Sequence, residues 1–350
     1  MSTTSATRLV DGYDLVMLDL DGVVYVGPDA VPGASVAIRR LKNSSTRLAF
    51  VTNNASRTPD RVAAHLTELD IPAEANDVVT SGQAAAGLLT TLLAPGSPVF
   101  LLGSPALAEA LEDVGLVPVQ DRVAHPVAVV SGYAPDIAWR LIMEGAVLVR
   151  DGLPWVASNT DLSVPTAHGV APGHGVLVKM ISEYADREPL VAGKPRPPLL
   201  QETVRRLGGS KPLMVGDRLD TDIEGASAIG VDSLLVLTGV TGLAELAVAP
   251  PNLRPTWISR DLGGLFGTPQ KPAALPGSVD HRHRLGEWEG WVTDGALRVE
   301  GLGERDDAWW QVAAAVAWSH LDATGARVDT SRLEEAGSAG PSGARDTVAP

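Results

Sequence analysis

Two carboxylates, Asp19 and Asp21, stand two positions apart at the end of the strand-like run Leu15–Leu20. Such a run predicts a buried strand, and parallel sheets bind their ligands beyond the carboxyl ends of their strands. A pair of carboxylates in that place suits a nucleophile and a general acid/base. Gly22 follows the pair and would let the backbone turn sharply beside a ligand. Because Asp-x-Asp is common at strand ends, the pair indicates a reaction only together with other segments.

Two further polar segments follow predicted strands. Thr52 ends the run Leu48–Thr52 and Asn53 follows it, and their hydroxyl and amide groups can donate hydrogen bonds to phosphate oxygens. Lys194 follows Leu190–Ala192, where its ammonium can neutralise a phosphate or a carboxylate nucleophile. Each segment also has a plainer interpretation, a capped turn for the first and a surface lysine for the second.

An acidic segment follows another predicted strand, Leu213–Val215. It holds Asp217, Asp220 and Asp222, three carboxylates within six positions. Carboxylates this close repel one another strongly unless a divalent cation lies among them, and ligation by oxygen atoms alone is typical of Mg²⁺. A solvated acidic helix N-terminus is the alternative interpretation.

The elements around these segments predict a parallel sheet. Strand-like runs alternate with helical patterns along the first 80 residues and again after residue 190, which is typical of a doubly wound α/β fold. The same alternation starts afresh between these regions. There we expect strands at Val99–Leu102, Val127–Val130 and Val147–Val149, and helices near 105–114, 135–144 and 176–184. One α/β domain interrupted by a second α/β module explains this order.

The four segments together resemble the motifs of the haloacid dehalogenase (HAD) superfamily of aspartyl-phosphate phosphatases. The matching stretches are Asp19-Leu20-Asp21-Gly22-Val23, Thr52-Asn53-Asn54, Gly193-Lys194-Pro195 and Gly216-Asp217 with Asp222. The resemblance covers about residues 11–265. The long gap between the second and third motifs is similar to the insertion of a type-IIA cap in NagD-like phosphatases. Dehalogenases lack an acid at the position of Asp21, so carbon–halogen cleavage is not expected.

The resemblance, together with composition, implies a domain plan. Residues 1–82 and 189–266 would form a Rossmann-like HAD core, and 83–188 an inserted α/β type-IIA cap with hinges near Ser81-Gly82 and Pro189. Residues 267–279 are predicted as a linker, 280–333 as a Trp-rich β-hairpin/helix appendage, and 334–350 as a disordered tail.

The resemblance also implies catalytic roles. Asp19 would attack phosphorus and form an aspartyl-phosphate. Asp21 would protonate the leaving alkoxide and then activate water. Thr52 and Asn53 would hold the phosphoryl oxygens, and Lys194 would bridge the phosphate and Asp19.

A Mg²⁺ cofactor is implied in the same way. Its ligands would be Asp19, Asp217 and the main-chain carbonyl of Asp21, with Asp222 acting behind them or through a water. These assignments agree with the general need of phosphoryl transfer for positioning and for neutralisation of charge.

In the cap, Asn159, Thr160 and Asp161 resemble the family segment that faces the active site. A plain surface loop is an equal interpretation of these three residues. His168 and His174 are expected to be loop residues rather than ligands.

The implied substrate is a small phosphate monoester, because a closing cap favours small esters over macromolecules. The sequence resembles the actinobacterial glycerol-3-phosphate phosphatases, and a polar cap loop without aromatic clamps favours a polyol phosphate. Phosphoglycolate, pyridoxal phosphate or a nucleotide would use the same mechanism. A non-catalytic regulator that binds a phosphorylated metabolite is a different class, which has no need of Asp19, Asp21 and Lys194 together.

Composition limits the partners and the compartment. The 350 residues carry 42 acidic and 28 basic side chains, a net charge of −14, and no cysteine. The acidity argues against nucleic acid, and the missing cysteines exclude disulfides and thiol chemistry. We find neither an apolar run long enough to span a membrane nor a signal pattern at Met1–Arg8, so we expect a cytoplasmic protein without membrane contact.

The last third of the chain carries a separate signal. Asp294-Gly295 between Trp288–Val292 and Ala296–Glu300 predicts a hairpin, followed by a helix over Asp306–Leu321. Five of the eight tryptophans lie in residues 280–321. A segment this small is marginal as an independent core. We expect it to dock on the main body or to mediate a homo-oligomer, as the cap also could, with a satellite cluster on its own chain as the alternative.

Overall fold

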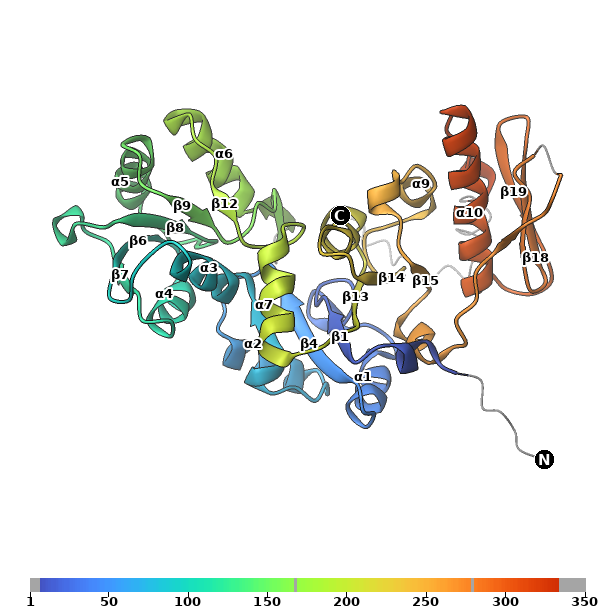
Figure 1. Ribbon diagram of the computed structural model, residues 1–350, viewed down its shortest axis with the longest axis horizontal. Helices are drawn as coiled ribbons and strands as arrows, with labels where there is room; N and C mark the ends of the chain where they lie inside the picture. Colours follow the sequence, from blue (N-terminus) through green and yellow to red (C-terminus); the bar gives the residue numbers. More distant parts are fainter. Residues whose placement is uncertain (1–6, 167–168, 278–279, 334–350) are drawn as a thin grey trace, which may run out of the picture.

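The computed structural model describes residues 7–166, 169–277 and 280–333, and its largest element is a six-stranded sheet (Figure 1). The strand order is β15-β14-β13-β1-β4-β5, and all neighbours pair in parallel. The strands are β1 (Leu15–Leu18), β4 (Arg47–Thr52), β5 (Val78–Thr80), β13 (Pro212–Gly216), β14 (Asp232–Val236) and β15 (Trp257–Ser259). The doubly wound sheet predicted from the sequence is therefore confirmed.

Both faces of this sheet are buried by helices. The helices are α1 (Ala34–Lys42), α2 (Pro59–Glu68), α7 (Pro197–Leu207), α8 (Glu224–Ala228) and α9 (Leu243–Ala247). Successive residues of β1 alternate between two apolar clusters: Val16 lies in one, and Leu15 and Met17 lie in the other. Two buried faces explain why the strands read as continuous apolar runs in the sequence.

A second parallel sheet forms the inserted module, at the far end of the molecule in Figure 1 from the C-terminal elements. Its order is β12-β9-β8-β6-β7. The strands are β6 (Pro98–Leu102), β7 (Val117–Val119), β8 (Ala128–Ser131), β9 (Trp155–Ala157) and β12 (Leu190–Val191), with helices α4 (Pro105–Glu112), α5 (Trp139–Arg150) and α6 (His174–Ala185). Because β12 belongs to this sheet, the module extends past residue 188, where the sequence pattern placed its end.

Two short two-stranded sheets lie beside these larger ones. The ribbon of β10 (Ser163–Thr166) and β11 (Gly169–Pro172) is attached to the cap, and β2 (Tyr25–Val26) pairs with β3 (Asp29–Ala30) just after the first motif. His174 is buried as the first residue of α6, and His168 lies outside the described residues, as does the predicted tail 334–350.

The predicted strand Val147–Val149 is wrong, because these residues continue helix α5. The third predicted strand of the cap is Trp155–Ala157 instead. Buried residues of α5 recur with helical spacing from Leu141 onward, and a short β-branched run inside such a pattern cannot be distinguished from a strand by its composition.

The predicted hinge at Ser81 and Gly82 lies in the first turn of helix α3 (Ser81–Thr90). Both residues are buried there. Thr80 caps the turn: its hydroxyl accepts from the Gln83 N–H at 3.2 Å, and the Gln83 side chain accepts from the Thr80 N–H at 3.1 Å. The connection from the core into the cap is therefore a capped helix.

The C-terminal elements form a four-stranded antiparallel sheet and a long helix, and the sheet contains the hairpin that the sequence predicts. The strands are β16 (Ala273–Ala274), β17 (His283–Leu285), β18 (Trp288–Thr293) and β19 (Ala296–Glu300), followed by α10 (Asp307–Thr324). The hairpin turn places both Asp294 and Gly295 at positive φ, which is the conformation that an Asp-Gly turn favours. Strand β16 lies within the segment predicted as a linker.

Helix α10 docks on the main body of its own chain. Trp309 shares an apolar cluster with Leu243 of α9. The Trp318 indole N–H donates to the carbonyl of Leu246 at 2.7 Å, and Arg254 forms an ion pair with Asp322 at 2.6 Å. No helix among the described residues is both long and apolar enough to cross a membrane.

Replacing Trp309 by Ala removes a side chain that is 1% exposed and belongs to the apolar cluster that joins α10 to the hairpin strands and to α9. We expect the free energy of unfolding of the unit that holds α10 to fall by about 3–5 kcal/mol, because the cavity cannot be filled without repacking. Denaturant unfolding followed by circular dichroism measures this change. Val36→Ala is the control, since that apolar side chain is 72% exposed. Equal losses in both variants would contradict the docked arrangement.

Candidate functional site

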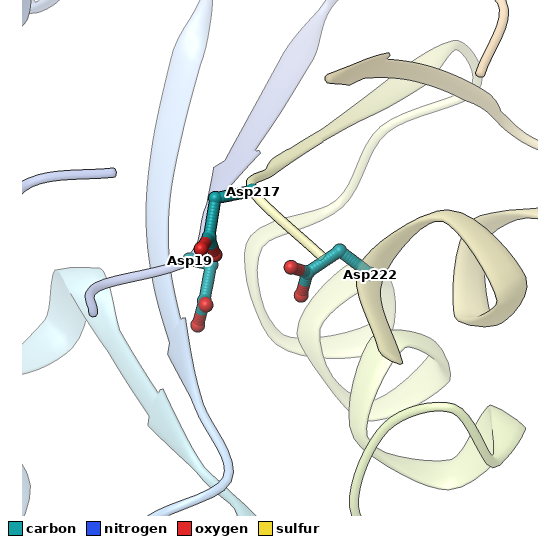
Figure 2. Close-up of side chains that lie close together, drawn as sticks. All are labelled: Asp19, Asp217 and Asp222. Atoms are coloured by element: carbon teal, nitrogen blue, oxygen red, sulfur yellow. The ribbon is translucent and has the colours of Figure 1, made fainter. Parts of the chain in front are cut away.

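The sequence-predicted site residues gather where the central strands of the six-stranded sheet end. Asp19 follows β1, Asp217 follows the neighbouring β13, and Thr52 ends β4 on the other side of β1. The chain passes from β1 to β4 on one side and from β13 to β14 on the other, and parallel sheets bind their ligands where the strand order reverses in this way. Figure 2 shows that Asp19, Asp217 and Asp222 point toward one another there.

The three carboxylates form a buried anionic cluster. One oxygen from each of Asp19, Asp217 and Asp222 lies within 4.8 Å of the others. Burial is the largest cause that raises the pKa of each to about 6, and repulsion between the carboxylates adds to it. The folded chain therefore holds negative charge in a place where water cannot stabilise it.

Lys194 compensates part of this charge. Its side chain is 2% exposed, and Nζ lies 2.7 Å from Oδ1 of Asp19 and 2.7 Å from Oδ1 of Asp222. Burial alone would lower the pKa of Lys194, but the two carboxylates outweigh it and raise that pKa. The ammonium is thus charged and fixed against the predicted nucleophile.

The remaining oxygens fit a hard cation. Oδ2 of Asp217 accepts a hydrogen bond from the Val240 N–H at 2.7 Å, while its Oδ1 is buried without a hydrogen-bond partner. Such an atom is costly unless something outside the protein satisfies it. A donor set of carboxylate oxygens is the set that Mg²⁺ prefers, so Asp19 and Asp217 fit the predicted ion. Both oxygens of Asp222 are already bonded, one to Lys194 and one to the Arg218 N–H.

Glycines allow the carboxylates to lie this close to the backbone. Gly22 has a φ of +81°, and a Cβ at Gly22 or Gly239 would collide with the Asp217 carboxylate. A Cβ at Gly216 would likewise collide with Asp222. A side chain at any of these positions would displace the cluster.

Asp21 lies at the mouth of the site. Its side chain is exposed, its backbone bridges to Tyr25, and Lys194 is among its charged neighbours. Partial loss of water raises the pKa of Asp21, and the positive charges of Lys194 and Arg57 counteract this rise. A carboxyl group with a raised pKa suits the predicted general acid/base.

Asp220 does not join the cluster, so the expectation that all three carboxylates of its segment surround one cation is wrong. The guanidinium of Arg218 donates to its two oxygens at 3.0 and 2.8 Å. A wide helical turn over Leu219–Ile223 buries Asp222 and leaves Asp220 in solvent. The sequence pattern also gave no role to Arg218, a half-exposed cation whose charge reaches Asp161 and Asp217.

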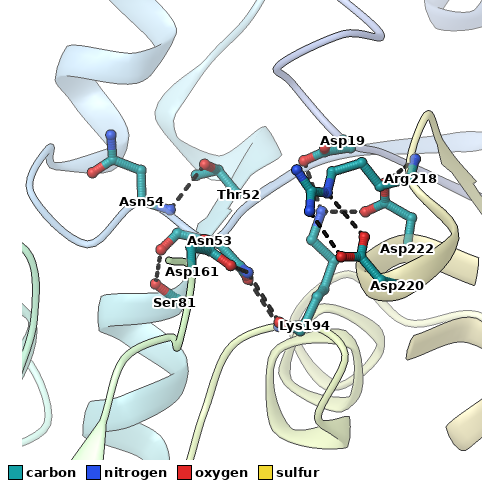
Figure 3. A network of polar contacts seen from close by, with 10 residues as sticks. All are labelled: Asp19, Thr52, Asn53, Asn54, Ser81, Asp161, Lys194, Arg218, Asp220 and Asp222. Carbon is teal, nitrogen blue, oxygen red and sulfur yellow. Dashed lines mark hydrogen bonds and ion pairs between the residues drawn. The ribbon is translucent and has the colours of Figure 1, made fainter. Parts of the chain in front are cut away.

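The predicted cap residues meet the core at Asn53 (Figure 3). The Asn53 side-chain amide donates to Oδ1 of Asp161 at 3.1 Å, and the Asn159 amide donates to the Asn53 carbonyl at 2.7 Å. Thr160 lies half-buried between these two cap residues. The structure therefore brings the predicted cap segment to the same edge as the carboxylates. Burial raises the pKa of Asp161, against the effect of Asn53, Lys194 and Arg218.

The two predicted phosphate-binding residues, Thr52 and Asn53, differ in which hydrogen-bond donors they still have available. The Thr52 hydroxyl accepts from the Asn54 N–H at 3.1 Å, and its own proton can still be donated. The Asn53 side chain uses its oxygen to accept from the Lys194 N–H at 2.8 Å. Its amide group donates to the Lys194 carbonyl at 3.0 Å and to Asp161. The side chain of Asn53 is thus fully engaged within the protein.

The sequence is similar to those of known proteins. Residues 16–117 match a family model described as haloacid dehalogenase-like hydrolase, and residues 191–265 match one described as HAD-hydrolase-like. The chain is 43% identical to the D-glycerol 3-phosphate phosphatase of Mycobacterium tuberculosis over 298 residues, 84% of this chain and 80% of that protein. It is 34% identical to the acid sugar phosphatase of Staphylococcus aureus over 71% of this chain and 95% of that protein.

Solved structures agree with this result. The glycerol phosphate phosphatase of M. tuberculosis in complex with magnesium has a TM-score of 0.79 at 40% identity, over 90% of this chain and 93% of that one. The thermostable NPPase of Geobacillus stearothermophilus has a TM-score of 0.66 at 31% identity, over 73% of this chain and 98% of that one. The first match extends into the C-terminal elements, because residues 1–266 are too few to supply it.

Asp217→Asn keeps the shape of the side chain and removes its charge. Without metal, the folded state binds the Asp217 proton more tightly than the unfolded chain does, because the folded pKa of about 6 lies above the usual 3.8. Wild type therefore loses stability relative to the variant as the pH rises from about 4 to about 6. The difference should reach on the order of 3 kcal/mol above about pH 6. Thermal unfolding in EDTA on both sides of this range measures it.

We expect added Mg²⁺ to make wild type more stable than Asp217→Asn. It stabilises wild type, because binding to the folded state alone raises stability, and it leaves Asp217→Asn unchanged. A variant that responds to Mg²⁺ as wild type does, or that is less stable than wild type in EDTA at neutral pH, would contradict the assignment of Asp217.

Proposed function

The chain belongs to the haloacid dehalogenase-like hydrolases, and we propose that it hydrolyses glycerol 3-phosphate through an aspartyl-phosphate formed on Asp19. Its reaction class is phosphoric monoester hydrolysis with Mg²⁺ as the cofactor. The observation that supports the substrate is the 43% identity, over most of the chain, to an enzyme named for D-glycerol 3-phosphate.

In the first step, a bond forms between a carboxylate oxygen of Asp19 and phosphorus while the bond from phosphorus to the substrate alkoxide breaks. Asp21 gives its proton to the leaving oxygen. One oxygen of Asp19 is held by Lys194, which leaves the other for the attack. The fixed ammonium requires no rearrangement when the phosphoryl group arrives.

In the second step, Asp21 takes a proton from water, and the water oxygen bonds to phosphorus as the bond to Asp19 breaks. Inorganic phosphate leaves and Asp19 is restored. Asp19, Asp217 and the main-chain carbonyl of Asp21 would hold Mg²⁺, which would supply positive charge that offsets the charge of the phosphoryl group. The hydroxyl of Thr52 would donate to one of these oxygens.

The cap supports a polyol as the leaving group. Asp161 lies between the core and the cap, and its carboxylate can accept hydrogen bonds from the hydroxyl groups of glycerol. The same carboxylate would repel the second negative charge of phosphoglycolate. Asn159 and Thr160 would complete this side of the substrate site.

A phosphate-release screen in Mg²⁺ tests the proposal. It compares glycerol 3-phosphate with phosphoglycolate, pyridoxal phosphate, a nucleotide and a sugar phosphate. We expect the highest kcat/KM for glycerol 3-phosphate, complete and reversible inhibition by EDTA, and a loss in Asp19→Asn of roughly 10³-fold or more. The control is Asp186→Asn, on the exposed surface of the cap, where Asn also tolerates the positive φ.

Two results would contradict this proposal at different levels. Strong turnover of another ester, with glycerol 3-phosphate at background, would refute the substrate. Turnover near wild type in Asp19→Asn or in EDTA would refute the mechanism.

The role given to Asp161 is tested by Asp161→Asn. The variant keeps an oxygen that can accept from Asn53 but removes the negative charge. We expect KM for glycerol 3-phosphate to rise about tenfold, since one charge-assisted hydrogen bond is lost. KM for phosphoglycolate should fall or stay constant. Steady-state kinetics with both esters measures these two changes in KM. An equal rise in both KM values would show that Asp161 does not contact the leaving group.

Association of the chain with itself stays a prediction. Trp139 and Met143, one turn apart on α5, are exposed and would suit a contact through the cap. The mass of the chain in solution tests it.

A further inference from the structure

The side chain of Asn53 pairs with the main chain of Lys194 as a neighbouring strand would. Its oxygen accepts from the Lys194 N–H at 2.8 Å, and its amide donates to the Lys194 carbonyl at 3.0 Å. Two bonds to both peptide groups of one residue fix its position along the chain and its orientation. The Lys194 backbone is therefore set by a side chain that is 141 residues away in the sequence.

The same side chain also holds the cap. The second proton of its amide goes to Oδ1 of Asp161 at 3.1 Å. The main-chain carbonyl of Asn53 accepts from Asn159 at 2.7 Å and from the Ser81 hydroxyl at 2.5 Å. Asn159 in turn accepts from the Asp161 N–H at 3.1 Å. The end of β4, the cap loop and the segment of Lys194 thus meet at one residue.

The packing leaves little room for these parts to move independently. A Cβ at Gly193 would lie only 2.7 Å from Oδ1 of Asn53 and 2.7 Å from the Ser158 carbonyl. The segment before Lys194 is therefore enclosed between Asn53 and the cap loop. A shift of that loop has to be transmitted to Asn53, to Gly193 or to both.

We propose that Asn53 is a positioning residue that couples the cap loop 158–161 to the ammonium of Lys194. This inference rests on the proposed function, in which Lys194 neutralises Asp19 and the phosphoryl group. When Asp161 is in place, Asn53 is fixed at both ends, and Lys194 Nζ stays 2.7 Å from Asp19 and Asp222. When the loop leaves, the Asn53 amide loses a partner and the Lys194 segment loses its rigid neighbour.

Hydrogen exchange tests the coupling without any substrate. In Asn53→Ala, exchange at the Lys194 amide should rise at least about tenfold, because its acceptor is gone, and exchange over 157–162 should rise with it. Asn54→Ala is the matched control. Among the described residues, the side chain of that neighbouring asparagine accepts only from the Ser56 N–H and hydroxyl, at 2.7 Å each, so both segments should exchange as in wild type.

Steady-state kinetics on the Mg²⁺-loaded enzyme gives the second readout. Asn53→Ala should lower kcat about 100-fold through the displaced Lys194 and also raise KM through the freed cap loop. Asp161→Ala should lower kcat as well, although Asp161 does not touch Lys194. In the double variant the loss in kcat should equal that of Asn53→Ala alone, because both changes break the same connection.

If Asn53→Ala does not fold, Asn53→Asp is used in the hydrogen-exchange experiment instead. It has the same shape and can still accept from the Lys194 N–H, but it cannot donate to the Lys194 carbonyl or to Asp161. We expect the Lys194 amide to stay protected while exchange over 157–162 rises at least about tenfold. Unchanged exchange in that loop would refute the link to the cap.

Other outcomes separate this inference from the proposed function. Multiplicative losses in kcat for Asn53→Ala and Asp161→Ala, or unchanged exchange at Lys194 in Asn53→Ala, would overturn the coupling while the phosphatase reaction stands. If wild type released no phosphate from any ester, the reaction would fail, and the exchange experiment would still decide whether Asn53 joins the two segments.

Discussion

The ammonium of Lys194 lies buried between the carboxylates of Asp19 and Asp222, 2.7 Å from an oxygen of each. Taking three charges out of water is costly, and only close geometry with further hydrogen bonds offsets that cost. The surrounding structure supplies both. Three parts of the chain, after β1, after β12 and after β13, have to end at one edge of the sheet for these groups to meet.

The charge balance of the site explains how so acidic a chain can bind an anion. Asp19, Asp217 and Asp222 carry more negative charge than Lys194 can neutralise, and burial raises the pKa of each to about 6. A divalent cation cancels this excess, so the site no longer repels a phosphoryl group. The net charge of −14 is therefore no obstacle at the site itself.

Sequence patterns predicted the parts that depend on local order. Polar residues that follow neighbouring strands of one parallel sheet lie at the same edge, so the sequence predicts that Asp19, Thr52 and Asp217 come together. Lys194 follows β12, a strand of the second sheet, so this rule does not place it. The features that were predicted wrongly or missed are those that the local sequence does not determine. Asp220 and Asp222 are the same residue type two positions apart, and only the wide turn between them decides which is buried. The partners of Asn53 lie 108 and 141 residues away, so no spacing reveals them.

The C-terminal elements cover an edge of the six-stranded sheet. Strand β15 is an edge of the six-stranded sheet, and an edge strand presents unpaired backbone groups that invite aggregation. Helix α10 covers this edge: the Gln311 amide donates to the Ile258 carbonyl at 3.4 Å, and the Asp307 carboxylate accepts from the Arg260 N–H at 2.8 Å. The NPPase matches 98% of its own length to 73% of this chain. That protein thus spans only about three quarters of this chain, whereas α10 packs on the β15 edge of the sheet through these two contacts.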